Sequence, residues 1–260
     1  MMSPKYGFRI ILLCTALIAG NARADTEAPA ADALADRIQG DIGVLAAGEQ
    51  SPIRGERTSP QVFPFAFFDY GRLYARIDTV GVKTLHMGYG YLEVAGRVAF
   101  DGFTTAGNPA LQGIQDRQNP VPLGFGTFQI TPVGGFFIYA LHDFNRSRGN
   151  QLEVTYVAEV DAGRVTLYPE AGFEHFTRQY TGYYFGVSPA EAAASGYAAS
   201  SPGAVTTPFL CLFVQVEVAR GWDADFYLRR KWLGAAVAAS PLVDTARPLT
   251  GFAAITAHFE

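Results

Sequence analysis

The feature that most constrains this chain is a repeated alternation of apolar and polar residues. Residues 151–160 and 207–218 both place apolar side chains at every second position, and in the first of them Leu152 and Val154 flank Glu153. Successive side chains of a β-strand point to opposite faces of the sheet, so such segments have one apolar and one polar face. The chain is therefore predicted to be all-β, with strands that separate an apolar environment from a polar one.

Turn residues divide the chain from residue 41 onward into about twelve such segments, an even number, as in bacterial single-chain transmembrane barrels. The connections alternate between short turns and long loops, as do the periplasmic turns and extracellular loops of those barrels. The exception is a short link at residues 79–81, where a long connection is due. If that link is no turn, the count falls to about ten strands. The predicted fold is an antiparallel transmembrane β-barrel.

Composition favours the same class of fold. Only 17% of the residues are charged and 49% are hydrophobic, with 28 Gly, 20 Phe and 13 Tyr. In an ordinary soluble domain about a quarter of the residues are charged. A soluble β-sandwich is the alternative, but it would place fewer aromatic residues at strand ends, where a membrane barrel has its interfacial girdles. The net charge of −4, without a basic patch, argues against a nucleic-acid partner.

The N-terminus has the pattern of a secretory leader. Lys5 and Arg9 form a positively charged segment before an apolar run at residues 10–19. An A-x-A cleavage site follows and ends at Ala24. We therefore expect the mature protein in the outer membrane after cleavage near Ala24. The predicted organisation is a signal peptide at residues 1–24, a flexible periplasmic segment at 25–40 and a barrel at 41–260. After cleavage Cys211 is the single cysteine, so no intrachain disulfide is expected.

One long connection, residues 180–203, contains a helix signal. Ser188 can cap the free backbone N–H groups, Pro189 fits the first helical position and Glu191 can complete a capping box. The alanines that follow favour helix, and Gly196 supplies a left-handed stop. A short helix is thus predicted in this loop, which lies on the extracellular side if the chain begins and ends in the periplasm.

Charged residues on the polar strand faces are the candidates for the barrel lumen. They are Glu153, Glu159, Glu170, Glu174, Asp223, Asp225 and Arg229. Glu170 and Glu174 lie about 13 Å apart along one strand, which is too far for a glycosidase carboxylate pair from a single strand. Ion pairing with Arg97, Arg229 or Lys231 is the simpler interpretation. A channel or a ligand-binding barrel is the alternative that these lumen charges motivate.

No catalytic or metal-binding constellation is evident in the sequence. The four histidines, His86, His142, His175 and His258, fall in four different strands without a metal-ligand spacing, so neither a metal nor a cofactor is expected. An outer-membrane hydrolase that uses His175 or Glu170 is a further alternative, but no motif marks a serine partner. The chain is predicted not to be an enzyme.

A longer pattern in the connection at residues 180–203 is more specific than the helix signal. It consists of Tyr184, Phe185, Gly186, Val187, Ser188, Glu191, Ala192, Ser195 and Gly196. These residues closely resemble the loop YFGVS-x-x-[QE]-A-x-x-SG of the MipA/OmpV family of outer-membrane proteins, and we call residues 184–196 the signature loop. A weaker resemblance covers the early hairpin at residues 61–78. Tyr197 and residues 200–203 depart from the family pattern, in which an aromatic follows a few residues on and then G-x-G.

The resemblance implies a non-enzymatic outer-membrane barrel. The name-giving member of the family is a scaffold that binds a lytic transglycosylase and a murein synthase, and other members are linked to adhesion or to the passage of small molecules. The implied partners are therefore outer-membrane lipid, a lytic transglycosylase and a murein synthase. The signature loop is expected to form a plug or outer cap, with residues 183–185 packed against the lumen wall.

Overall fold

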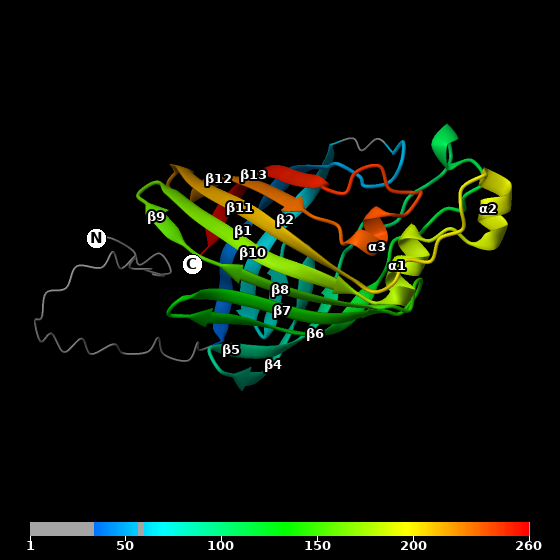
Figure 1. The fold of residues 1–260 in the computed structure, drawn as a ribbon. Helices are drawn as coiled ribbons and strands as arrows, with labels where there is room; N and C mark the ends of the chain where they lie inside the picture. The colour runs from blue at the N-terminus through cyan, green and yellow to red at the C-terminus, as the bar shows by residue number, and fades with distance from the viewer. Residues whose placement is uncertain (1–33, 57–59, 260) are drawn as a thin grey trace, which may run out of the picture.

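The computed structural model describes residues 34–56 and 60–259. The predicted signal peptide, and residues 25–33 of the predicted periplasmic segment, lie outside this part of the chain. Within it, antiparallel strands follow one another round a closed wall, because β11 (Val205–Ala219) pairs with both β10 (Val165–Phe176) and β12 (Trp222–Lys231). Figure 1 shows the resulting barrel from the side. The predicted fold, an antiparallel β-barrel, is confirmed.

The remaining elements complete the wall and its loops. The other strands are β1 (Ala35–Glu49), β2 (Gln61–Gly71), β3 (Leu73–Arg76), β4 (Thr79–Met87), β5 (Gly90–Arg97), β6 (Pro122–Thr131), β7 (Gly134–Asp143), β8 (Asn150–Val157), β9 (Val160–Ala162) and β13 (Leu249–Phe259). The helices are the 3-10 turn η1 (Pro109–Leu111), α1 (Arg178–Phe185), α2 (Pro189–Ser195) and α3 (Ala235–Ala238). Among the described residues no helix is long and apolar enough to cross a membrane.

β8 and β9 are two parts of one wall strand. Both pair with β10 in the same register, since Val157 lies opposite Glu170 and Val160 opposite Leu167. Between them the Ala158 N–H donates a hydrogen bond to the Pro169 carbonyl at 3.0 Å. The return bond to the Ala158 carbonyl is missing, because proline has no N–H. The thirteen strand segments of the described chain therefore make a wall of twelve strands, as predicted, and the count of ten is excluded.

Three boundaries differ from the prediction. The link between β3 and β4 is Ile77–Asp78, and residues 79–81 belong to β4. Ile77 makes this turn with a φ of 59°, a conformation that β-branched residues rarely adopt. β1 begins at Ala35, so residues 35–40 form strand where a flexible segment was expected. The alternation pattern also predicts a long strand at residues 164–179, but the strand ends at Phe176, where the chain enters α1.

The two ends of the barrel are different. Short turns lie at one end, together with the start of β1 and the end of β13. The long loops and the helices lie at the other end (Figure 1). Outer-membrane barrels have their short turns in the periplasm and their long loops outside, so the helical end is extracellular. The outward positions form an apolar belt, with exposed side chains that include Val44, Val62, Leu210, Phe226 and Ile255.

Aromatic side chains at the inward positions stack on one another across neighbouring strands. Phe128 stacks on Phe137 with ring centroids 4.1 Å apart, and Tyr227 stacks on Phe252 at 4.9 Å. Gly126 makes room for a further inward ring, that of Tyr139, because a Cβ there would lie 2.0 Å from Cδ1 of Tyr139. Glycine inside a strand weakens it unless a neighbour needs the space, and here the neighbour is an inward tyrosine.

Candidate functional site: the barrel lumen and the extracellular cap

A chain of ion pairs crosses the lumen. Arg97 of β5 contacts Glu153 of β8 at 3.1 Å, and Arg229 of β12 approaches the same carboxylate at 3.6 Å. Arg229 and Lys231 both contact Glu174 of β10, at 2.9 and 3.0 Å. β5 and β12 lie opposite each other, since five wall strands separate them in each direction. The ion pairs therefore join opposite sides of the barrel.

These lumen charges are buried and mutually neutralised. The side chains of Arg97, Glu153, Arg229 and Glu174 are 9, 13, 15 and 10% exposed. An isolated ion in such a place would cost several kcal/mol, so each charge needs an opposite partner. The Arg229 guanidinium also lies 3.7 Å from the ring centroid of Phe209, a cation–π contact. The arrangement spans the lumen with charge-paired side chains.

A second ionic cluster lies on the β2–β5 side and was not identified from the sequence. Arg76 and Lys83 contact Asp69 at 2.7 and 3.2 Å. Tyr139 donates its hydroxyl to Glu93 at 2.9 Å, and Glu93 is 1% exposed. The alternation of side chains along each strand could have identified these residues. Each of them falls at a position that alternation assigns to the inward face of its strand.

The structure does not bring the remaining predicted lumen residues into one site. Asp225 accepts a hydrogen bond from the Thr256 hydroxyl at 2.7 Å. Asp223 is buried two residues away on β12, Glu170 lies opposite Cys211 on the neighbouring strand, and Glu159 falls at the break between β8 and β9. In the described chain no three His, Cys, Asp or Glu residues are placed to hold a metal ion.

The signature loop forms α2 with the predicted caps. The Glu191 N–H donates to Ser188 Oγ at 3.3 Å, and the Ser188 N–H donates to Glu191 Oε2 at 2.9 Å, which completes the capping box. Gly196 ends the helix with a φ of 79°. Figure 1 shows α2 at the far extracellular tip, beyond the strand ends. The signature loop is thus part of an outer cap and not a plug inside the lumen.

Glu191 also fixes the signature loop to the long β5–β6 loop. Its Oε1 accepts a hydrogen bond from the Gln115 N–H at 3.1 Å and contacts Arg117 Nη2 at 2.7 Å. Burial raises the pKa of Glu191, but the hydrogen bonds from the Ser188 and Gln115 N–H groups and from Arg117 outweigh it and lower the pKa to about 2. Arg117 in turn donates to the Tyr183 carbonyl at 2.6 Å.

An apolar cluster joins four extracellular segments into one cap. It contains Ile53, Phe103, Leu111, Ile114, Val187 and Leu242, all buried. At the root of the cap, Tyr180 stacks on Phe176 of β10 at 4.7 Å and donates to Asp101 at 2.8 Å. Phe185 packs against a further cluster that includes Val205 and Val237. The cap is therefore a packed unit continuous with the barrel mouth.

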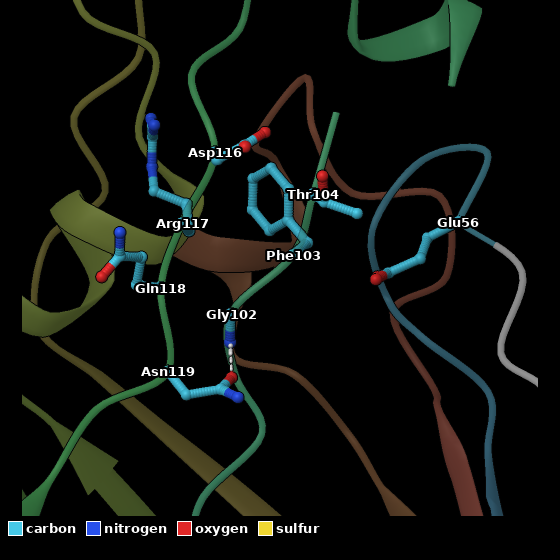
Figure 2. A pocket seen from close by; sticks show the side chains of 8 residues that line it. All are labelled: Glu56, Gly102, Phe103, Thr104, Asp116, Arg117, Gln118 and Asn119. Carbon is cyan, nitrogen blue, oxygen red and sulfur yellow. Dashed lines mark hydrogen bonds between the residues drawn. The ribbon is translucent and has the colours of Figure 1, made fainter. Parts of the chain in front are cut away.

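A polar pocket of about 360 Å³ opens on the cap. Figure 2 shows Thr104 and Asp116 on facing stretches of the β5–β6 loop, with Glu56 of the β1–β2 loop across from them. Hydrogen bonds from the backbone and side chain of Thr105 lower the pKa of Asp116, so this carboxylate is ionised at neutral pH. Gln118 and Asn119 also line the pocket, and Asn119 Oδ1 accepts a hydrogen bond from the Gly102 N–H at 2.9 Å. Such groups suit a hydroxyl-rich ligand.

The closed wall and the apolar outer belt define a transmembrane β-barrel of the outer membrane. The family to which the chain belongs is that of the MltA-interacting protein MipA, whose family model matches residues 42–259.

The chain is similar to other outer-membrane proteins. It is 28% identical over 151 residues to outer membrane protein OmpV of Vibrio cholerae, and 28% identical over 151 residues to outer membrane protein Omp26La of Vibrio anguillarum. Each alignment covers 58% of this chain and 58% of the relative, so it spans little more than half of these relatives. Among solved structures, Pseudomonas putida OprB aligns over 86% of this chain and 94% of its own, with 9% identity and a TM-score of 0.34.

Proposed function

We propose that this protein is a non-conducting, non-enzymatic scaffold of the outer membrane that binds a lytic transglycosylase at its periplasmic end and, through the complex, a murein synthase. The observation that carries the proposal is the chain of ion pairs from Arg97 to Lys231, which spans the lumen at the level of β5, β8, β10 and β12. A barrel blocked in this way presents its surfaces and turns to partners, and solutes do not pass through it.

The family supports the choice of partner. The description of the family names an MltA-interacting protein, and a lytic transglycosylase is the enzyme class that the resemblance of the signature loop implies. The cap lies on the opposite side of the membrane from the cell wall, so the contact falls on the short turns. Those turns include residues 88–89, 132–133 and 220–221.

The side chains weighed for hydrolysis support a non-enzymatic role. His175 Nδ1 lies 2.9 Å from Thr206 Oγ1 on the adjacent strand. Alternation along β10 places His175 on the face opposite to Glu174, so it points outward while Glu170 points into the lumen. A base and a carboxylate on opposite faces of one wall cannot act on the same substrate.

The test is site-specific photo-crosslinking in intact outer membranes. A benzophenone amino acid at Val133, in an exposed periplasmic turn, is expected to capture a murein hydrolase that mass spectrometry identifies. The matched control is the same probe at Gln112 in the extracellular cap, which is expected to capture none. Capture of no murein enzyme from Val133 or from the other short turns would contradict the proposal.

The closed lumen has its own test. Purified protein in planar bilayers is expected to give no steady conductance under conditions in which an open porin conducts. Reproducible single-channel steps from the intact protein would favour the channel alternative instead.

A second candidate, binding of an extracellular ligand, is favoured by the cap pocket of Figure 2. Its amide and carboxylate lining suits a saccharide. Binding to an oligosaccharide array that is lost in Gln118→Ala, with the fold retained, would support it. Equal binding by both proteins would remove this pocket from consideration.

A further inference from the structure

In the described part of the chain, the backbone pairing of the wall is interrupted beside the extracellular half of β2. β3 has four residues and pairs only with residues 67–70 of β2. The chain then turns back, and the Ile77 N–H donates to the Ala66 carbonyl at 2.7 Å. In the described part of the chain, residues 61–65 of β2 thus have no strand partner on this side, although β1 pairs with them on the other. We call this break the seam.

Pro64 lies in the middle of the seam. The bond from Ile77 to Ala66 means that even-numbered residues of β2 direct their backbone groups toward β3, so the nitrogen of Pro64 faces the seam. Proline within a strand is confined to edges of this kind, because it has no N–H to offer a neighbour. An N–H group without a partner would be costly in lipid. The proline also opposes the addition of a further strand.

The opposite side of the seam is the segment 98–100 that follows β5. The Val98 N–H donates to the Asp78 carbonyl at 2.8 Å, which places this segment above the β3–β4 turn. No backbone hydrogen bond joins it to residues 61–65 among the described residues. Instead the ring of Phe100 lies 5.4 Å from the ring of Phe63. Side chains, and not a hydrogen-bonded ladder, close the wall here.

The seam lies within the apolar belt. Tyr70 marks the periplasmic girdle on β2. Val62 lies eight residues from Tyr70, toward the extracellular end of the same strand. At a rise of about 3.3 Å per residue and a tilt of about 40°, this separation is roughly 20 Å along the membrane normal. The apolar band of such barrels is about 25 Å tall. Val62, which is 71% exposed, therefore faces the hydrocarbon of the outer leaflet.

The interior behind the seam is apolar. Phe63 lies on the inward face of β2 with Phe65, and both belong to a cluster with Leu45 and Phe252. An ion pair between Arg76 of β3 and Asp69 of β2 lies six residues further along β2 than Phe63, toward its periplasmic end. An apolar surface thus runs from the lipid-facing belt, past Phe100 and Phe63, to the inner side of β1, β2 and β13.

We propose that the seam binds an acyl chain of an outer-leaflet lipid, lipopolysaccharide in this membrane. The seam is continuous with the lipid-facing belt, both of its sides are apolar, and Pro64 disfavours a protein strand as occupant. The acyl chain of the lipid enters between Val62 and Val98 and rests against Phe63. The lipid is thereby held by the barrel wall more tightly than the lipids of the surrounding belt.

A photo-probe on the inward face tests this directly. p-Benzoylphenylalanine replaces Phe63 in one protein and Phe137 in the control. Phe137 also faces the lumen, but its strand is paired on both sides. Each protein is extracted in detergent, washed and irradiated. A lipopolysaccharide adduct is expected with the probe at position 63, and no such adduct is expected with the probe at position 137.

A second measurement needs no probe. Native mass spectrometry of the detergent-purified protein is expected to show one retained lipopolysaccharide. Val98→Trp, which fills the seam, is expected to lose it, whereas Val94→Trp, an outward position earlier on β5, is expected to keep it. A gel shift on heating verifies that each variant is folded.

Three results would overturn the proposal. Adducts absent at position 63, or equal at positions 63 and 137, would show that no lipid enters by the seam. An adduct with phospholipid alone would contradict the assignment to the outer leaflet. An adduct with a protein would show that the occupant is a polypeptide.

Discussion

Arg97 and Glu153 form an ion pair of 3.1 Å between strands β5 and β8, which are not neighbours in the wall. The two side chains are 9 and 13% exposed, so water screens them little. Glu153 also lies 3.6 Å from Arg229, and one carboxylate therefore serves two guanidinium groups. These long side chains meet across the interior of the barrel at this level.

Removing Glu153 is expected to destabilise the barrel. Glu153→Leu leaves Arg97 without its closest carboxylate and Arg229 with Glu174 alone. Loss of one partner from a buried ion pair costs about 3–5 kcal/mol, because an uncompensated charge remains. The measurement is denaturant unfolding of the protein in detergent micelles. The control is Asp161→Asn on the exposed short strand β9, where a change below about 0.5 kcal/mol is expected; equal effects of both substitutions would contradict the prediction.

The cap is expected to loosen in acid because of Glu191. Its pKa is lowered from 4.5 to about 2 in the folded cap. A depressed pKa contributes stability that is present above about pH 4.5 and is lost as the pH falls toward 2. The protection factors of the α2 amides, which correct for the intrinsic pH dependence of hydrogen exchange, are therefore expected to fall through this window.

The control for the acid effect is Glu191→Gln, which removes the titrating group. Its α2 amides are expected to have lower protection factors than those of the parent at pH 7, with little further change in the protection factors between pH 4.5 and 2. A parent whose α2 protection factors do not change over that window would show that Glu191 does not hold the cap.

Gly126 is expected to tolerate no side chain. A Cβ at this position would lie 2.0 Å from Cδ1 and 2.3 Å from Cε1 of Tyr139, whose hydroxyl donates to Glu93. Gly126→Ala is expected to displace the ring and to cost about 1–3 kcal/mol through overpacking. Gly48 offers a matched control on β1, since no atom lies within 4 Å of its Cβ position. Unfolding curves that coincide for Gly126→Ala and Gly48→Ala would exclude the steric account.

The strand faces and the number of wall strands could be predicted because both depend on local patterns. Alternation along residues 151–160 placed Glu153 inside and Leu152 outside without any knowledge of neighbours. The partner of Glu153 could not be identified in this way. Arg97 is 56 positions away in the sequence, and the contact arises from the closure of the wall, which brings non-neighbouring strands within reach of two long side chains.

Two of the three boundary differences, at the end of β10 and at the β3–β4 turn, have a common origin in tertiary contacts. Residues 178–185 contain three tyrosines and a phenylalanine, which favour strand over helix. They form α1 because Tyr180 stacks on Phe176 and Tyr184 is fully buried in the cap. The turn at Ile77 was missed because isoleucine rarely takes a positive φ. There the pairing of β3 with both β2 and β4 outweighs the local cost.

Two prolines in the wall are expected to respond in opposite ways to the same substitution. Pro169 faces Ala158, whose N–H already donates to the Pro169 carbonyl. Pro169→Ala supplies an N–H that can return this bond and join β8 to β9, so stability is expected to rise by about 0.5–1.5 kcal/mol. Pro64 faces the seam, where the described chain offers no strand partner. Pro64→Ala adds a donor without an acceptor in the apolar belt, and a loss of about 1–3 kcal/mol is expected. Unfolding midpoints in one detergent measure both effects, and shifts of the same sign for the two variants would refute the assignment of residues 61–65 as a free edge.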